Sequence, residues 1–279
     1  MPSKPIKPAK YAKGHIRRPD KDQLIRMSNA RHRAMLQAKQ AVPPPPAWDS
    51  RKQNWVGPIK DQQQCGSCWD FSGTGIVDIA YNKAGVGGGP NVFILSEEYT
   101  LSCCRNGGCG GDDNTTVLEY AKTYGLPLES VYGHYGPYPN ANKCKIPSCA
   151  WKPAMQLYKI TDWGFADGTS GTQSMPSILA IKSAIMNYGA VGAGIAADDA
   201  FQSIQPGTVF QNTGATQIDH DIILVGWDDS KKAWLLRNSW ALCGRIKAIV
   251  GSHTARTASV RKLCGAKSHR SLSQPGVIL

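Results

Sequence analysis

The nine cysteines constrain this 279-residue chain more than any other feature of its sequence. Seven of them lie between residues 65 and 149, and the other two are Cys243 and Cys264. A dense cluster of cysteines predicts a fold held by disulfides, which persist in oxidising compartments. Their odd number leaves at least one thiol outside any bridge. The sequence therefore predicts a disulfide-linked region that also carries a free thiol.

The first residues do not look like a leader to such a compartment. Residues 1–8 are rich in lysine and proline and lack the apolar core of about 7–15 residues that a secretory signal needs. No apolar run approaches the roughly 18 residues of a transmembrane helix. The cysteine pattern thus favours an extracellular or another oxidising location, whereas the amino-terminal residues provide no signal for it.

The net charge of +12 sits at the two ends of the chain. Residues 1–45 carry 11 Lys/Arg and two Asp (+9), and residues 241–279 carry seven Lys/Arg and no acid (+7). Residues 46–240 therefore carry 14 basic and 18 acidic residues, a balance of −4. A nucleic-acid-binding protein needs a basic surface on its folded part, so we expect no nucleic-acid partner. The basic ends are interpreted as solvated tails.

Three parts follow from this composition. Residues 1–45 are a basic amino-terminal extension, expected to hold a disordered arm over 1–19 and a helix from Asp20 to about Val42. The prolines at 43–46 end that helix. Residues 46–240 are the globular domain, and residues 241–279 are an atypical basic tail without acidic or aromatic residues.

Within the domain, a helix-rich half precedes a strand-rich half, which predicts an α+β fold of two lobes with a cleft between them. A helix that starts near Ser67 contains Gly73 and Gly75, each costing about 1 kcal/mol of helix propensity, so we expect it to be buried and closely packed. The other predicted elements are helices at Thr115–Tyr124 and Pro176–Tyr188 and strands at Ala190–Ala197, Thr208–Gln211, Ile218–Trp227 and Ala233–Arg237.

The pair Cys65-x-x-Cys68 carries the chemistry, and alone it fits a redox pair, half of a zinc site or a nucleophile beside a structural cysteine. Zinc requires a second close pair, and the candidate pairs downstream are spaced too widely. A thioredoxin-like pair has an aromatic residue before its first cysteine, whereas Trp69 follows the second. The remaining interpretation is a catalytic cysteine at a helix start, where the helix N-terminus favours a thiolate.

A catalytic cysteine needs a histidine as its base. Of six histidines, only His220 lies within a strand pattern, where an inert core residue is the default interpretation. Asn238 follows 18 residues later, and the turn at Asp228–Ser230 folds the second strand back beside the first. The sequence thus offers one histidine with one amide partner.

At these residues the chain resembles the papain-like cysteine peptidases. The segment Cys65-Gly66-Ser67-Cys68-Trp69 matches the C-G-S-C-W signature of that family, which has its His and Asn far downstream. Four other segments resemble the family in the same order, and the resemblance covers roughly Trp48 to Trp240. These segments are Pro46–Arg51, Leu95–Cys103, Asp219-His220 and Asn238–Trp240.

The resemblance implies a role for each matching residue. Cys68 is the nucleophile, His220 exchanges the proton, Asn238 orients the imidazole, and Gln62 completes the oxyanion hole with the Cys68 N–H. Gly110, Gly111, Ile218 and Trp240 are implied to bind substrate, Trp240 also shielding the His220–Asn238 hydrogen bond. The implied disulfides are Cys65–Cys109 and Cys103–Cys144, with Cys104–Cys149 as an additional one.

Three features depart from the family. Asp70 replaces a small apolar residue, and we expect a carboxylate that the helix N-terminus favours. Asp112 occupies the second Gly of the substrate-binding loop, where its side chain hinders binding or selects basic residues. After Trp240 the composition changes abruptly, so we expect the tail to leave the edge of the β-rich lobe unpaired and activity to be reduced.

The sequence as a whole predicts a monomeric cysteine endopeptidase that acts on proteins or peptides through a Cys68 thioester, without metal or cofactor. The extension at 1–45 occupies the place of an inhibitory propeptide and is shorter than the usual one, so autoinhibition is a hypothesis. A catalytically weak homologue that binds or inhibits other proteins is the alternative.

Overall fold

The computed structural model describes most of the domain and part of the extension. The described residues are 12–20, 23, 43–86, 93–104, 107–138, 146–153, 155–166, 176–203, 208–210 and 217–240, with the backbone of 248–251 and 263–268. The expected helix at 20–42 lies outside these residues apart from Asp20 and Gln23.

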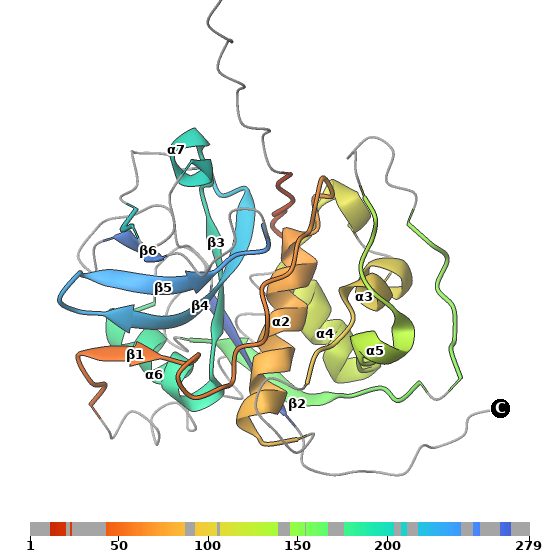
Figure 1. The fold of residues 1–279 in the computed structure, drawn as a ribbon, viewed down its shortest axis with the longest axis horizontal. Coiled ribbons are helices and arrows are strands. Elements are labelled where there is room, and N and C mark those ends of the chain that lie inside the picture. Colours follow the sequence, from red (N-terminus) through yellow and green to blue (C-terminus); the bar gives the residue numbers. More distant parts are fainter. Residues whose placement is uncertain are drawn as a thin grey trace, which may run out of the picture.

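Two lobes meet along helix α2 (Cys68–Lys83), which runs through the middle of the molecule (Figure 1). On one side lie α3 (Glu97–Cys103), α4 (Asn114–Thr123) and α5 (Glu129–Tyr132). On the other side lies the greater part of an antiparallel sheet, with α6 (Ile178–Tyr188) and the short α7 (Asp199–Gln202) beside it. The predicted two-lobed α+β fold is confirmed.

The sheet has the strand order β2-β7-β3-β4-β5-β6, and β1 pairs with β4. Its strands are β1 (Ala47–Asp49), β2 (Ile160–Phe165), β3 (Val191–Ile195), β4 (His220–Asp228), β5 (Ala233–Arg237), β6 (Ala248–Gly251) and β7 (Leu263–Ser268). Because the turn at 229–232 returns β5 antiparallel to β4, the first residue of β4 and the residues after β5 lie at the same end of the sheet.

Helix α2 is buried along almost its whole length, as its two internal glycines predicted. A Cβ atom added at Gly73 would lie 2.4 Å from the Val117 Cβ of α4. One added at Gly75 would lie 2.6 Å from Ile223 Cδ1 of β4. The glycines therefore let both lobes approach the helix more closely than any side chain permits, and packing offsets their cost in helix propensity.

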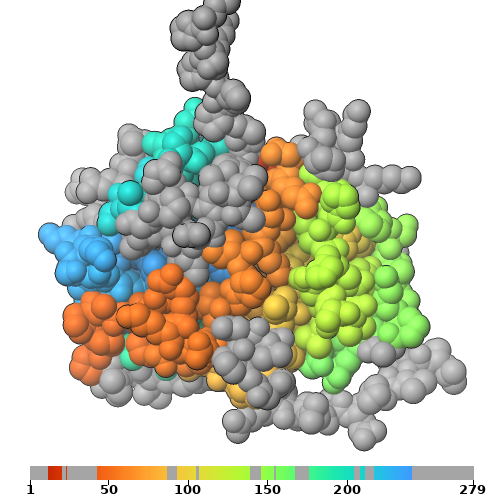
Figure 2. Space-filling model, viewed as in Figure 1, coloured from red at the N-terminus to blue at the C-terminus, as the bar shows by residue number. Residues whose placement is uncertain are grey.

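Each lobe has its own hydrophobic core. One core includes Trp69, Ile79, Leu95, Leu118 and Trp163, around α2 and the helical lobe. The other includes Ile181, Ile185, Leu224, Trp227 and Trp240, around the sheet and α6. In the space-filling view, residues between about 45 and 80 extend across the face from the β-rich lobe to the helical one (Figure 2). This segment thereby joins the two cores.

The prediction for the tail, residues 241–279, is partly wrong. β6 pairs with β5, and β7 pairs with both β2 and β3, so two segments of residues 241–279 cover edges that we expected to be open. Strand pairing uses backbone N–H and C=O groups, so weak alternation of side chains does not prevent it. The strand predicted at Thr208–Gln211 is also wrong, because its described residues contain only a single bridge position, at Phe210.

Two disulfides hold the helical lobe. Cys65 is bonded to Cys109, the pairing that the resemblance implied. The expected Cys103–Cys144 bond is wrong, since Cys103 is bonded to Cys149 with their Cα atoms 4.7 Å apart. The stretch before Ala150 passes Tyr132, whose hydroxyl accepts from the Ala150 N–H at 3.4 Å and lies 3.8 Å from the Cys103 sulfur. Cys149 is therefore the cysteine brought to Cys103, and an additional Cys104–Cys149 bond is excluded.

Peptide mapping of the non-reduced protein tests this assignment. We expect a linked pair of fragments that contain Cys103 and Cys149, because these two sulfur atoms are bonded to each other. The Cys149→Ser variant should lose that link and about 2–4 kcal/mol of unfolding free energy. The Cys144→Ser variant is the matched control and should keep the link. A Cys103–Cys144 fragment in the native protein would contradict the assignment.

Candidate active site

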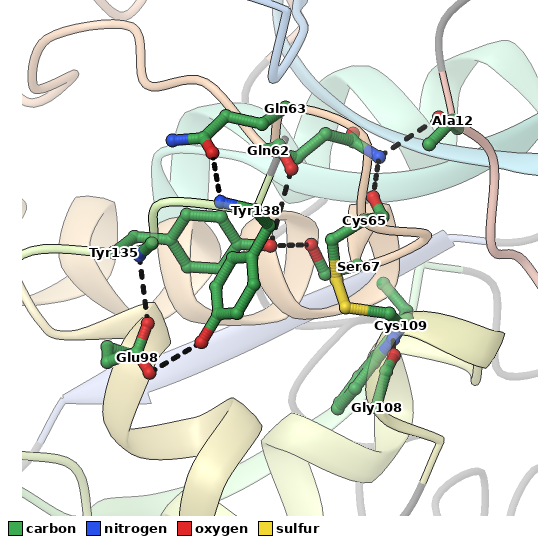
Figure 3. Close-up of a disulfide and its surroundings, with 12 residues drawn as sticks. Ala12, Gln62, Gln63, Cys65, Ser67, Glu98, Gly108, Cys109, Tyr135 and Tyr138 are labelled. Atoms are coloured by element: carbon green, nitrogen blue, oxygen red, sulfur yellow. Dashed lines mark hydrogen bonds between the residues drawn. A yellow bond between two sulfur atoms is a disulfide. The ribbon is translucent and has the colours of Figure 1, made fainter. Parts of the chain in front are cut away.

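Cys68 is the first residue of α2 and has no exposed surface. The preceding loop is fixed by the Cys65–Cys109 disulfide and by Ser67, whose hydroxyl contacts the Tyr135 hydroxyl at 2.5 Å (Figure 3). Ser67 therefore makes no side-chain cap on the helix. The N–H groups of the first turn remain as a source of positive potential around the Cys68 sulfur.

His220 and Asn238 form the pair that the sequence suggested. His220 Nε2 lies 2.8 Å from Asn238 Oδ1. Because an amide oxygen only accepts hydrogen bonds, the ring proton is on Nε2 and Nδ1 is left as the basic nitrogen. Within the described residues, Nδ1 has no hydrogen-bond partner.

Trp240 stacks on His220, with ring centroids 4.3 Å apart and planes 22° from parallel. Its side chain is 1% exposed and also contacts Phe201. This position covers the imidazole and leaves Trp240 almost no surface for a substrate. Its predicted shielding role fits this geometry better than its predicted contact with substrate.

Gln62 is held with its side-chain amide directed along the loop before α2. Its Oε1 accepts from the Ser239 hydroxyl at 2.5 Å, and its Nε2 donates to the Cys65 carbonyl at 2.9 Å. The same Nε2 donates to the carbonyl oxygen of Ala12 at 3.0 Å (Figure 3). Gln62 thus already binds a peptide carbonyl, although that carbonyl comes from the chain's own extension. Ser239 is a supporting residue that the sequence analysis missed.

Residues 12–16 of the extension lie between the two lobes, where the red segment of Figure 1 meets α2. On the helical side, the Asp112 N–H donates to the Gly14 carbonyl and the Ile16 N–H donates to the Asp112 carbonyl, both at 2.8 Å. On the sheet side, the His15 N–H donates to the Asp219 carbonyl at 3.1 Å. We call the space that residues 12–16 fill the inter-lobe groove. The expectation of a disordered arm is wrong here, because backbone pairing on both sides fixes the segment.

The groove accepts this segment because glycines line the contact. A Cβ added at Gly14 would lie 1.6 Å from the Gly66 carbonyl oxygen. One added at Gly111, whose φ is +106°, would lie 2.5 Å from the Gly14 carbonyl oxygen. Gly111, predicted to bind substrate, therefore lies at the groove wall. Gly110, predicted with it, has no atom within 4 Å of its Cβ position and does not line the contact.

The Asp112 side chain does not enter the groove. Its carboxylate accepts from the Asp113 N–H at 2.7 Å and from the Thr116 hydroxyl at 3.0 Å, at the start of α4. Both bonds use Oδ1. Desolvation raises the pKa of Asp112, and the positive charge of Arg18 in the extension acts against that shift. The expectation that this side chain selects basic residues therefore stays a prediction.

Burial controls the charge of the catalytic pair. Residues 12–16, which we call the covering segment, exclude water from Cys68. This desolvation raises the pKa of the Cys68 thiol far above its usual range, and the negative charge of Asp221 raises it further. Desolvation lowers the pKa of His220 to about 4. The covered site therefore holds a neutral thiol and a neutral imidazole at pH 7, and the reactive ion pair requires water to reach the groove.

Asp70 also differs from its expectation. Its side chain is fully buried, one oxygen accepts from the Thr74 hydroxyl at 3.0 Å, and burial together with Glu97 raises its pKa well above the usual range. Burial thus favours the protonated form of Asp70 more than in an ordinary carboxyl group, because desolvation opposes the favourable potential of the helix N-terminus.

The described part of the chain contains no helix that is long and apolar enough to cross a membrane. Over the same residues, no group of three or more His, Cys, Asp or Glu side chains is placed to hold a metal ion.

Comparison with known proteins agrees with this geometry. Residues 44–251 match the family described as papain family cysteine protease. The chain is 32% identical to cathepsin K of Gallus gallus over 203 residues, which covers 70% of this chain and 55% of that protein. It is 31% identical to cathepsin Z of Onchocerca volvulus over 212 residues, which covers 70% of this chain and 66% of that protein.

Among solved structures, the digestive procathepsin L2 proteinase of Tenebrio molitor larval midgut superposes with a TM-score of 0.66 at 25% identity. The superposition covers 81% of this chain and 69% of that one. The chain thus spans about 55% and 66% of the length of the two cathepsins that it matches. The chain belongs to the papain family of cysteine proteases, a family of thiol proteases and hence of hydrolases.

The lowered pKa of His220 predicts how stability depends on pH. A base whose folded-state pKa of about 4 lies below its ordinary 6.5 stabilises the fold above pH 6.5, and this contribution is lost as the pH falls through 4. The loss amounts to roughly 3 kcal/mol. Between pH 7 and 4, the unfolding free energy of His220→Gln should therefore fall less than that of the native chain by up to this amount.

Urea unfolding at each pH measures this difference. The control is His134→Gln, which removes a histidine whose side chain is 89% exposed and paired with Glu129 at the surface, and its profile should differ from the native one by much less than that of His220→Gln. Parallel pH profiles for the native chain and His220→Gln would show that the imidazole is not desolvated.

Proposed function

We propose that this chain is a cysteine endopeptidase with Cys68 as nucleophile, and that residues 12–20 hold it in a covered form. The observation that carries the proposal is the hydrogen bond from Gln62 Nε2 to the Ala12 carbonyl, 3.0 Å long, beside a paired His220 and Asn238. The groove thereby binds an extended peptide with the groups that acyl transfer needs. Residues 12–16 are an internal stretch of the chain, with further residues on both sides in the sequence, which favours cleavage within chains.

In the first half of the reaction, the Cys68 thiolate attacks the substrate carbonyl while His220 carries the proton. The oxygen that becomes negative is stabilised by Gln62 Nε2 and by the Cys68 N–H at the start of α2. The tetrahedral intermediate then expels the amine, which takes its proton from His220. A thioester between Cys68 and the amino-terminal part of the substrate remains.

In the second half, His220 takes a proton from water, and the hydroxide formed attacks the thioester. The acid product leaves, and the thiolate–imidazolium pair is restored. Asn238 keeps Nδ1 directed toward the sulfur by fixing the tautomer through Nε2. Trp240 keeps water away from that fixing hydrogen bond.

The covering segment suppresses this chemistry in two ways. It occupies the backbone partners at Asp112 and the amide of Gln62 that a substrate would use. It also desolvates Cys68 and His220, so both are neutral. We therefore assign residues 12–20 an autoinhibitory role, which must be relieved before a substrate enters.

The occluded groove also favours a second candidate, a catalytically weak homologue that binds other proteins. The two candidates differ in whether Cys68 becomes an activated thiolate once the segment moves away. A mechanism-based epoxide, which alkylates activated cysteine thiolates, distinguishes them.

Replacement of the nucleophile gives the first functional test. The Cys68→Ala variant should lose epoxide labelling and peptide hydrolysis altogether, because no other group can form the thioester. The Cys104→Ala variant, which removes a buried thiol at the end of α3, should keep both. Hydrolysis by Cys68→Ala at the native rate would refute the mechanism.

Release of the covering segment gives the second test. In Gly14→Val, the added Cβ overlaps the Gly66 carbonyl oxygen at 1.6 Å, so the segment should leave the groove. Labelling of Cys68 at pH 7 should accelerate by about tenfold or more, the response to a loss of about 1.4 kcal/mol of segment binding. Ile16→Ala is the matched control, since Ile16 is 53% exposed, and it should label at the native rate. Equal rates for all three chains would exclude autoinhibition.

A further inference from the structure

One side chain of the covering segment enters a pocket on the sheet side of the groove. His15 Nδ1 lies 3.0 Å from Asp221 Oδ2, and the two side chains are 7% and 0% exposed. The residue before it, Gly14, contributes a backbone N–H that favours the Cys68 thiolate. The pocket is therefore adjacent to the nucleophile, one residue along the bound chain.

The pocket is lined by Asp221, Ile218 and Gly194, and we call it the His15 pocket. Gly194 lies opposite Asp221 in the pairing of β3 with β4. A Cβ at Gly194 would lie 2.7 Å from Ile218 Cγ2, 3.6 Å from Asp221 Oδ1 and 3.9 Å from His15 Cε1. The absence of a side chain at Gly194 thus lets Ile218 pack close to the carboxylate and its guest. Ile218, predicted to bind substrate, is the apolar wall.

Asp221 is not satisfied by this guest. One carboxylate oxygen is bonded to His15, while the other, Oδ1, is buried and has no hydrogen-bond partner among the described residues. A buried acceptor without a donor costs free energy, and a carboxylate accepts through both oxygens. An imidazole offers one N–H in this direction, whereas a guanidinium offers two parallel N–H groups.

We propose that Asp221 makes the His15 pocket a recognition site for a basic side chain, arginine above all, in the peptides that this chain binds and cleaves. This specificity rests on the proposed function, since it names the substrate class of that site. The covering segment then acts as a ligand with a weaker basic group, which a substrate with arginine displaces.

The surrounding charges agree with this assignment. The neighbouring Asp219 is paired with Lys13 of the segment at 2.7 Å, so a second basic residue of the extension meets a second acid on the sheet side. The Asp112 carboxylate accepts two hydrogen bonds at the start of α4 and lies within electrostatic reach of Arg18, farther along the segment. Asp221 is consequently the acid in contact with the side chain next to the nucleophile.

Recognition at Asp221 also affects the nucleophile. The negative charge of Asp221 raises the pKa of Cys68 and so disfavours the thiolate. A cation bound against Asp221 offsets that repulsion. A substrate with a basic side chain in the His15 pocket is thus bound and, by the same contact, assists the formation of the reactive thiolate.

The covering segment serves as the probe ligand in the test. We compare the full native chain with His15→Arg and His15→Leu. The measurement is hydrogen exchange of the amides of residues 15 and 16, which donate to the carbonyl oxygens of Asp219 and Asp112. His15→Leu should exchange about tenfold faster than the native chain, and His15→Arg should exchange several-fold more slowly. When Asp221→Asn is added to each of these three chains, their amides should exchange at similar rates. Asp162→Asn removes a carboxylate of β2 that is paired with Lys122 of α4. It is the charge-matched control and should preserve the ranking.

Exchange that is no slower in His15→Arg than in His15→Leu would overturn the proposal, and this comparison remains decisive if Asp221→Asn does not fold. Cleavage of peptides that differ only in Arg or Leu separates the proposal from the proposed function. We expect Gly14→Val to prefer the arginine peptide by roughly 10- to 100-fold, and Asp221→Asn in that background to lose the preference. If neither peptide is cleaved while the exchange ranking holds, the proposed peptidase function is wrong and the recognition of basic side chains stands. If both peptides are cleaved equally well, only the proposed specificity is wrong.

Discussion

The position of every group in the site depends on the burial of α2 between the two lobes. Gly73 and Gly75 let α4 approach one face of the helix and β4 the other, to distances that a Cβ would block. Cys68 at the first turn is therefore fixed against the helical lobe, and β4 brings His220 to the same end. The two hydrophobic cores lock this relation, because a shift of the helix would open both.

The groove that results is covered by the protein's own extension, and the cover changes the chemistry as well as the access. Backbone pairing with Asp112 and Asp219 holds the segment, and the Ala12 carbonyl occupies the amide of Gln62. The water that would stabilise a thiolate and an imidazolium is excluded, so the covered pair is neutral. Occupation of the groove and the neutral state of Cys68 and His220 are thus two effects of one contact.

The acidic residues of the domain differ in their environments, although the sequence alone does not distinguish them. Asp70 is buried with its pKa raised by desolvation, and the Asp112 carboxylate accepts the Asp113 N–H just before α4. Asp221 alone directs a buried carboxylate at a side chain in the groove. The basic residues 1–45 are interpreted from the sequence as a solvated tail, whereas Lys13 and His15 pair with Asp219 and Asp221 of the domain.

The sequence by itself determined the α+β fold, the helix at Cys68, the strands that carry His220 and Asn238, and the distance between them along the chain. These follow from local periodicity, turn residues and motif spacing, which a linear sequence records. Only the tertiary structure decided that Cys103 bonds Cys149, that the tail pairs with the sheet, and that His15 meets Asp221. Each of these joins residues far apart in the chain, through a disulfide, backbone hydrogen bonds or a buried polar contact. Which residues meet depends on the path of the intervening loops and on the exclusion of water, and no local pattern encodes either.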